Sequence, residues 1–258
     1  MVNLYFSGAE NLSCEKLFRD LKVKYLLFSF LHLKDYRILK EAKLNNVTVM
    51  VDSGAHTLQK GKEINYDKFV DRYINFINNY SDYIDCFVEL DIENVVGLDR
   101  VEEWTEKIIK ETGRQPIVVW HKERGWKYWK EMCKKYDYVG FSGFVSKGGK
   151  KEVEDKYLPL FLREAKKHNT KVHGFGLTRF KVLDRYKFES VDSLSWKAGS
   201  IYGVFYYFNE YAKRLEAIDR KEFRGKYGKK LSGMNNFFID YWNLSQWLKY
   251  AESLEEIK

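Results

Sequence analysis

Acidic residues follow apolar, β-branched runs at several points along the chain. The run 47–51 ends at Asp52, and Asp91 and Asp192 follow similar runs. An apolar run of this length is typical of a strand that is buried on both faces and carries polar residues at its C-terminal tip. Parallel strands end at one edge of a sheet, so we expect these carboxylates to converge. Converging carboxylates raise the pKa of at least one acid, which suits general acid/base and nucleophilic chemistry. A strand-end aspartate can instead cap the next helix.

Histidines and glycines occupy matching strand ends. His56, His121 and His173 could join the aspartates in a metal site or stack on a planar substrate. The chain has no His-x-His or His-x₃-His spacing, so a metal is the less specific interpretation, and we expect neither a metal nor a cofactor. Glycines at these tips would let a flat ligand approach backbone N–H groups, or would serve packing and turns. They are Gly140, Gly143, Gly174 and Gly176.

The composition is that of a globular protein. The chain has 258 residues, a usual length for one α/β barrel, and 45% apolar with 32% charged residues exclude a disordered or fibrous chain. Three widely spaced cysteines without Cys-x-x-Cys argue against a disulfide framework or a cysteine-rich zinc site. We therefore expect a cytoplasmic protein. No apolar stretch approaches the roughly 20 residues of a membrane span, and no export signal is visible.

Basic residues are concentrated near the C-terminus. The net charge is +8, and eight of the eighteen residues from Lys213 to Lys230 are basic against three acidic ones. A surplus of this kind favours a polyanionic partner such as nucleic acid, although a lysine-rich surface can also serve solubility.

The periodicity predicts eight strands, each followed by a helix or helical turn. Strict alternation with short connections predicts right-handed crossovers and a parallel sheet, and eight repeats favour closure into a (β/α)8 TIM barrel with a C-terminal helical extension. No G-x-G-x-x-G follows the first strand, which disfavours a Rossmann fold. We place the barrel at 1–215, including an aromatic helix at 201–215. Residues 216–258 supply a basic loop at 221–231 and a terminal helix packed on the barrel within a single domain. The expected strands are 3–8, 24–30, 47–51, 85–91, 117–121, 138–143, 171–176 and 190–194.

Several of these strand-end motifs resemble the tRNA-guanine transglycosylase superfamily, barrel enzymes that exchange guanine in a polynucleotide for a 7-deazaguanine base. The segment 52–56, Asp-Ser-Gly-Ala-His, is similar to the family's Asp-Ser-Gly-Gly-Phe/Tyr, which implies that Asp52 is the general acid/base. The segment 188–192 is similar to the family's Val-Asp-Met-Phe-Asp, which implies that Asp192 is the nucleophile. An alternative register would put Ser195 there. The implied base-binding residues are Ser53, Gly54, His56, Asp91, Trp120, His121, Ser142, Gly143, His173 and Gly174.

The chain departs from the family at two places. No cysteine follows Cys133, so the family's zinc cluster has no counterpart, and Trp120 and His121 stand where a base-reading glutamine is expected. These departures resemble the smaller virus- and prophage-type relatives associated with 7-deazaguanine in DNA.

The resemblance implies exchange of guanine for a free 7-deazaguanine base in DNA, or in tRNA, through a covalent Asp192 intermediate. A duplex hides the glycosidic bond, so the target base would be flipped out or single-stranded. Two alternatives stay open: a non-catalytic nucleic-acid-binding partner subunit, and a nucleoside or glycoside hydrolase. An oligomer is also possible. The residues expected to contact phosphates are Lys197, Arg224, Lys226, Lys229 and Lys230.

Overall fold

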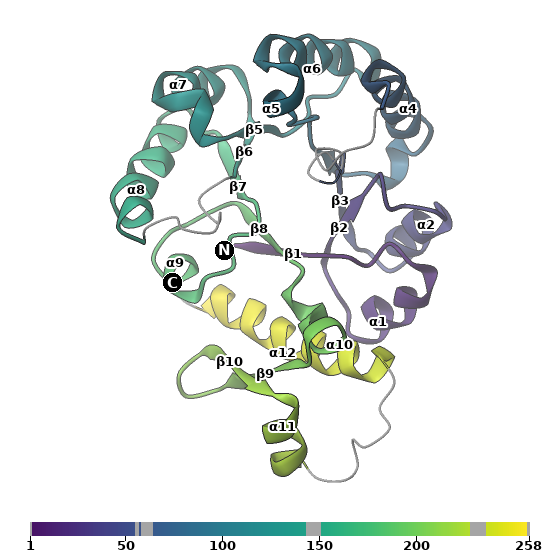
Figure 1. The fold of residues 1–258 in the computed structure, drawn as a ribbon, viewed down its shortest axis with the longest axis vertical. Helices are drawn as coiled ribbons and strands as arrows, with labels where there is room; N and C mark the ends of the chain where they lie inside the picture. The colour runs from purple at the N-terminus through teal and green to yellow at the C-terminus, as the bar shows by residue number, and fades with distance from the viewer. Residues whose placement is uncertain (1, 55–56, 58–63, 143–150, 228–235, 257–258) are drawn as a thin grey trace.

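Eight parallel strands form the centre of the molecule, with helices around them (Figure 1). The computed structural model describes residues 2–54, 57, 64–142, 151–227 and 236–256. The strands are β1 (Asn3–Ser7), β2 (Tyr25–Ser29), β3 (Thr48–Asp52), β4 (Cys86–Phe87), β5 (Val118–Trp120), β6 (Tyr138–Phe141), β7 (Lys171–Gly174) and β8 (Ser190–Ser193).

The sheet closes on itself. Its strand order is β4-β3-β2-β1-β8-β7-β6-β5, and a parallel bridge joins Val88, after β4, to Ile117, before β5. Across this seam the Ile117 N–H donates to the Phe87 carbonyl at 2.7 Å, and the Glu89 N–H donates to the Ile117 carbonyl at 3.1 Å. The predicted (β/α)8 barrel is therefore confirmed.

The outer helices follow the predicted alternation, and their ends carry recognisable caps. Asn65 caps α4 (Tyr66–Asn79) because its side chain accepts the Lys68 N–H. Gly113 ends α6 (Leu98–Thr112) in the left-handed region. No helix in the described ranges is both long and apolar enough to cross a membrane. The helices are α1 (Glu15–Asp20), α2 (Arg37–Leu44), α4 (Tyr66–Asn79), α5 (Glu93–Val96), α6 (Leu98–Thr112), α7 (Gly125–Lys135), α8 (Lys151–Lys167), α9 (Phe180–Leu183) and α10 (Ala198–Tyr202).

Side chains fill the barrel interior. Alternate strand residues point inward, and six of them form one buried cluster. Gly140 faces this space: a Cβ there would lie 2.4 Å from the Phe175 ring, so the glycine makes room for that ring. The filled interior leaves the barrel mouth, the end at which the strands finish, as the place where a site could be formed. The cluster consists of Tyr5, Leu27, Met50, Val88, Ile117 and Val119.

The helix predicted at 201–215 is wrong. This region forms an antiparallel hairpin, β9 (Val204–Asn209) and β10 (Arg214–Asp219), so the boundary expected at residue 215 falls inside a strand. Aromatic residues have high strand propensity, and the Asn209 side chain stabilises the turn by accepting the N–H groups of Tyr211 and Ala212. The loop expected at 221–231 is also wrong over its first part, because α11 (Arg220–Tyr227) is helical there. Residues 228–231 lie outside the described part.

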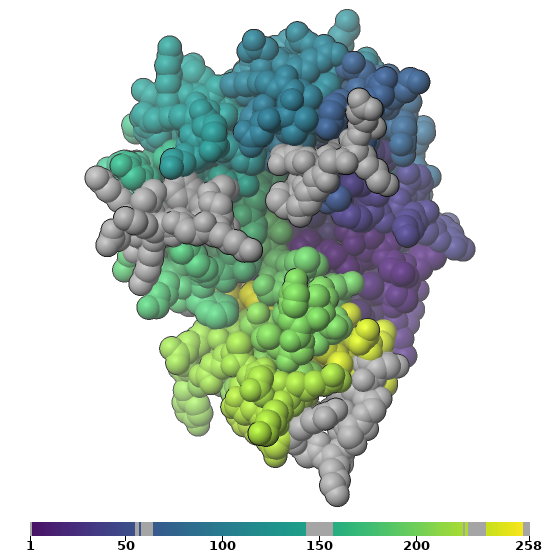
Figure 2. Space-filling model, viewed as in Figure 1, coloured from purple at the N-terminus to yellow at the C-terminus, as the bar shows by residue number. Residues whose placement is uncertain are grey.

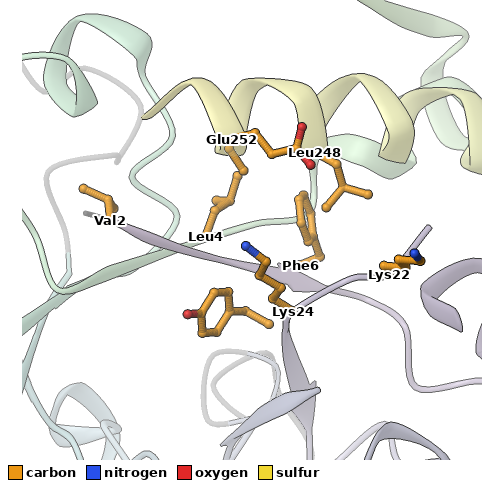
Figure 3. A pocket seen from close by; sticks show the side chains of 9 residues that line it. Val2, Leu4, Phe6, Lys22, Lys24, Leu248 and Glu252 are labelled. Atoms are coloured by element: carbon orange, nitrogen blue, oxygen red, sulfur yellow. The ribbon is translucent and has the colours of Figure 1, made fainter. Parts of the chain in front are cut away.

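The terminal helix packs against the barrel as expected. α12 (Asn236–Glu256) runs along the outer face of β1, and Leu244 and Trp247 belong to the main core (Figure 1). A cavity of about 40 Å³ lies between α12, β1 and the start of β2 (Figure 3). Val2 and Lys24 line it, so it lies at the end where strands begin, opposite the barrel mouth.

Candidate active site

Three carboxylates converge at the barrel mouth. Asp52 ends β3, Asp91 follows β4, and Asp192 lies in β8. The pKa of Asp52 is raised to about 7: burial is the largest cause, the charges of Asp91 and Asp192 act in the same direction, and the Gly54 N–H, which donates at 3.1 Å, opposes them. The convergence expected from the strand ends is therefore present, and it contributes to the raised pKa of Asp52.

Asp91 forms a pair with His121, which follows β5. The His121 Nε2 and Asp91 Oδ2 atoms are 2.9 Å apart, and both side chains are mostly buried. Burial alone would lower the pKa of His121, but the hydrogen bond and charge of Asp91, with Glu93 nearby, outweigh it and raise the pKa. The imidazole is thus a partner that orients Asp91.

Asp192 is held through one oxygen. Its Oδ1 accepts the Gly176 N–H at 2.7 Å and lies 3.5 Å from His173 Nε2. Among the described residues no hydrogen bond or ion pair involves Oδ2. The side chain is 15% exposed. Oδ2 is therefore the oxygen available to attack an electrophile.

His173 does not stack on a substrate at the barrel mouth, contrary to the prediction. It is completely buried, because it points into the barrel from β7 and contacts the rings of Tyr5 and Phe175. Its Nδ1 hydrogen-bonds to Ser190 Oγ. The structure places it beneath Asp192.

Trp120 also lies away from the barrel mouth. It is 3% exposed, stacks on Phe141 with ring centroids 5.2 Å apart, and donates its indole N–H to the Gly125 carbonyl. It faces outward from β5 into the core between sheet and helices, so it cannot read a base. Gly174 likewise serves packing, since a Cβ there would press on Leu177 and Phe188.

The segment after β3 has a constrained backbone. Gly54 has φ +85°, and a Cβ there would lie 2.5 Å from Leu31, so only glycine fits. Ser53 is fully buried, and Ser142, which follows β6, is partly buried and donates its N–H to the Trp120 carbonyl at 3.0 Å. His56 and Gly143 lie outside the described residues.

Ser195, the alternative nucleophile, lies in the short helix η4 (Ser195–Lys197). Its side chain hydrogen-bonds with that of Tyr206, and its N–H donates to Ser193 Oγ at 3.1 Å. It therefore contacts the hairpin, whereas Asp192 belongs to the carboxylate group.

The basic residues expected to bind phosphates lie on separate elements. The Lys197 ammonium is 5.0 Å from the Trp196 ring centroid, and that of Lys226 is 4.6 Å from the Tyr207 ring centroid. The hairpin and α11 project beyond the barrel at one end of the molecule (Figure 2). Arg224 lies in α11, but its side chain is outside the described part of the chain. Lys229 and Lys230 lie outside it entirely.

A buried ion-pair network stands behind Asp91 and was not predicted. The Arg124 side chain is 1% exposed and donates to Glu89 at 3.0 Å and to both oxygens of Glu93 at 2.8 and 3.0 Å. Burial raises the pKa of Glu89 despite the arginine; for Glu93 burial acts in the same direction, but the Arg124 bonds outweigh it and lower the pKa. The network fixes segment 89–93, which carries Asp91.

Two inward-facing residues, Tyr138 and Ser190, were also missed. Each lies two positions before a residue that the sequence did single out, Gly140 and Asp192, so the period of two along a strand was the available signal. In the parts of the chain that the structure describes, no three His, Cys, Asp or Glu side chains are placed to share a metal ion.

Comparison with models of protein families finds no match for this chain, and comparison with curated proteins finds none. A proposal of function is therefore supported by the arrangement of residues at the barrel mouth and by the resemblance of the strand-end motifs.

Proposed function

We propose that this protein exchanges guanine for a 7-deazaguanine base in DNA through a covalent intermediate on Asp192. The observation that supports it is the unequal environment of two neighbouring carboxyls. Asp52 has a pKa of about 7, suited to giving and taking a proton near neutral pH. Asp192 receives the Gly176 N–H on Oδ1 and presents Oδ2. Carboxyls whose environments differ in this way take different roles in a reaction.

In the first step, Asp192 Oδ2 attacks C1′ of the target deoxyguanosine. The C1′–oxygen bond forms as the bond from C1′ to the guanine ring nitrogen breaks, and Asp52 gives its proton to the departing base. Guanine leaves neutral, and Asp52 is left as a carboxylate.

In the second step, Asp52 takes the ring N–H proton of the incoming 7-deazaguanine. That nitrogen bonds to C1′, the ester bond to Asp192 breaks, and the carboxylate is restored. Asp91 accepts hydrogen bonds from N1–H and the exocyclic amine of the base, and His121 and the Arg124 network hold Asp91 in place.

Access to C1′ requires a flipped or single-stranded nucleotide. Lys197 lies in η4, four residues beyond the end of β8, and Lys226 on α11 extends the basic surface along the projecting end. The likeness to zinc-less relatives favours DNA over tRNA.

The test mixes the protein with guanine-labelled DNA and, separately, with labelled tRNA. We expect guanine release from DNA and an adduct that survives denaturing electrophoresis, with Asp192→Asn as the control that forms none. Release that needs no incoming base and leaves an abasic site would indicate a hydrolase. Binding without release or adduct on either polymer would indicate a non-catalytic subunit and contradict the proposal.

A further inference from the structure

A buried histidine nitrogen faces Asp192 without a hydrogen bond. His173 is completely buried; its Nε2 is 3.5 Å from Asp192 Oδ1 and has no hydrogen-bond partner in the described part of the chain. Its other nitrogen, Nδ1, is 2.5 Å from Ser190 Oγ. Which nitrogen carries the proton decides whether His173 attracts or repels the Asp192 carboxylate.

The hydrogen-bond chain behind His173 sets that choice. Tyr138 Oη lies 2.5 Å from Ser190 Oγ, its one hydrogen-bond partner among the described residues. The phenol hydrogen has no other acceptor in the described part of the chain, so it is satisfied only if Tyr138 donates it to Ser190 Oγ. The Ser190 hydroxyl then has its own hydrogen left to donate, and it lies within reach of His173 Nδ1. Because Nδ1 accepts, the ring proton is on Nε2.

We propose that His173 is a positioning residue that donates its Nε2–H to Asp192 Oδ1 and thereby turns Oδ2 toward the sugar. A small rotation of the carboxylate closes the 3.5 Å gap to a hydrogen bond. Together with the Gly176 N–H, which donates to the same oxygen at 2.7 Å, the imidazole leaves Oδ2 for bond formation.

The catalytic consequence rests on the proposed function. When Oδ2 bonds to C1′, Oδ1 becomes the ester carbonyl and still accepts both N–H groups. When the ester breaks, negative charge returns to the carboxylate, and the same donors stabilise it. His173 therefore assists departure of Asp192 from C1′ as well as its attack.

The proton position is measured without any activity, so this arm stands apart from the proposed function. In protein with ¹⁵N-labelled histidine, we expect the His173 proton on Nε2 and an unprotonated, hydrogen-bonded Nδ1. The spectrum of His173→Gln, which loses these signals, assigns them among the five histidines. A proton on Nδ1 in the wild type would overturn the proposal.

Variants then test whether the chain, and not the Asp192 charge, fixes the proton. In Asp192→Ala the Nε2–H form should persist. Adding Tyr138→Phe frees Ser190 to accept, so an Nδ1–H population should appear; adding Tyr5→Phe removes a buried interior hydroxyl outside the chain and should change nothing. Equal spectra for the two double variants would refute the role of Tyr138.

Single-turnover adduct formation tests the effect on Asp192. His173→Leu, which lacks an N–H, should slow it about 10- to 100-fold with KM for the polymer unchanged, as loss of an orienting partner does. His173→Gln, which can place an N–H near the Nε2 position, should recover most of the rate. If leucine and glutamine slow the reaction equally, His173 only fills space. If the wild type forms no adduct while the proton is on Nε2, the proposed function fails and the hydrogen-bond chain stands.

Discussion

Replacing Asp52 by asparagine should make the protein more stable and less active. The substitution keeps the shape of the side chain and removes a carboxyl whose charged form is opposed by burial and by Asp91 and Asp192. The activity loss follows from the missing proton donor and should be about 10²- to 10⁴-fold in exchange, while an adduct still forms slowly.

The pKa sets the size and the sign of the stability change. A rise from 3.8 to about 7, at about 1.4 kcal/mol for each pH unit, amounts to about 4 kcal/mol as an upper limit, because the side chain keeps some contact with solvent. The folded protein holds this proton more tightly than the unfolded chain. Wild-type stability therefore falls as pH rises from about 4 to about 7, and the Asn variant should not show this contribution.

Urea unfolding at a series of pH values from 4 to 8 measures the difference. We expect wild type and Asp52→Asn to be equally stable near pH 4, and the variant to lead by up to about 4 kcal/mol near pH 8. Asp82→Asn, at an exposed position in η2 (Ser81–Tyr83), is the control and should stay within about 0.5 kcal/mol throughout. An Asp52→Asn variant that is no more stable than wild type at pH 8 would refute the assignment of Asp52 as a perturbed acid.

Three further predictions concern the nucleophile, the basic surface and the buried network. Asp192→Asn should abolish the denaturant-resistant adduct and Ser195→Ala should spare it, as read on a gel; the reverse result would move the nucleophile by three residues. Arg124→Met should lower the free energy of unfolding by about 3–5 kcal/mol, because it leaves two buried carboxylates without their cation. Arg19→Met, which removes a surface ion pair, should lower it by less than about 1 kcal/mol; chemical unfolding measures both. Neutralising four basic residues together should weaken polynucleotide binding and flatten its dependence on salt in a titration, and an unchanged slope would place the polyanion elsewhere. These four are Arg224, Lys226, Lys229 and Lys230.

The barrel could be predicted because each strand is short, apolar and closed by a polar tip. Strand ends agree with the sequence to within a few residues, as at β3 and β8. The hairpin could not be predicted from apolar spacing alone. Segment 204–209 is aromatic enough to suit either a helix or a strand, and the turn chemistry of Asn209 was the signal that decides for a strand.

The acidic residues of the site could be predicted from the sequence, but the residues that contact them could be predicted only in part. A strand-end Asp is visible in sequence because its type is unusual after an apolar run. For His173 the predicted place on β7 is correct, but the predicted stacking on a substrate is wrong, because strand alternation points the side chain into the barrel. The same alternation explains Trp120. It precedes His121 on the chain, so its side chain points to the other face of the sheet, where it stacks on Phe141.

Contacts with α12 hold the hairpin against the barrel, and they therefore limit the path that a bound polynucleotide could follow. An unpaired strand edge is a liability unless something covers it. In β9 the N–H groups of Tyr206 and Phe208 donate to side-chain oxygens of Asn243 and Gln246 at 2.9 and 3.0 Å. Side-chain amides of α12 therefore accept the hydrogen bonds that a neighbouring strand would accept.

α12 also contacts η4 and α10 and lines one cavity together with β1, so one helix joins the hairpin, and α11 after it, to the barrel wall (Figure 3). Lys226, whose ammonium lies over the Tyr207 ring of β9, is thus on an element attached to the barrel. If both the barrel mouth and α11 contact one polynucleotide, the strand must leave the mouth over η4 and α10, because these connect β8 to the hairpin. Neutralising Lys197, on that route, should then weaken binding together with the residues of α11.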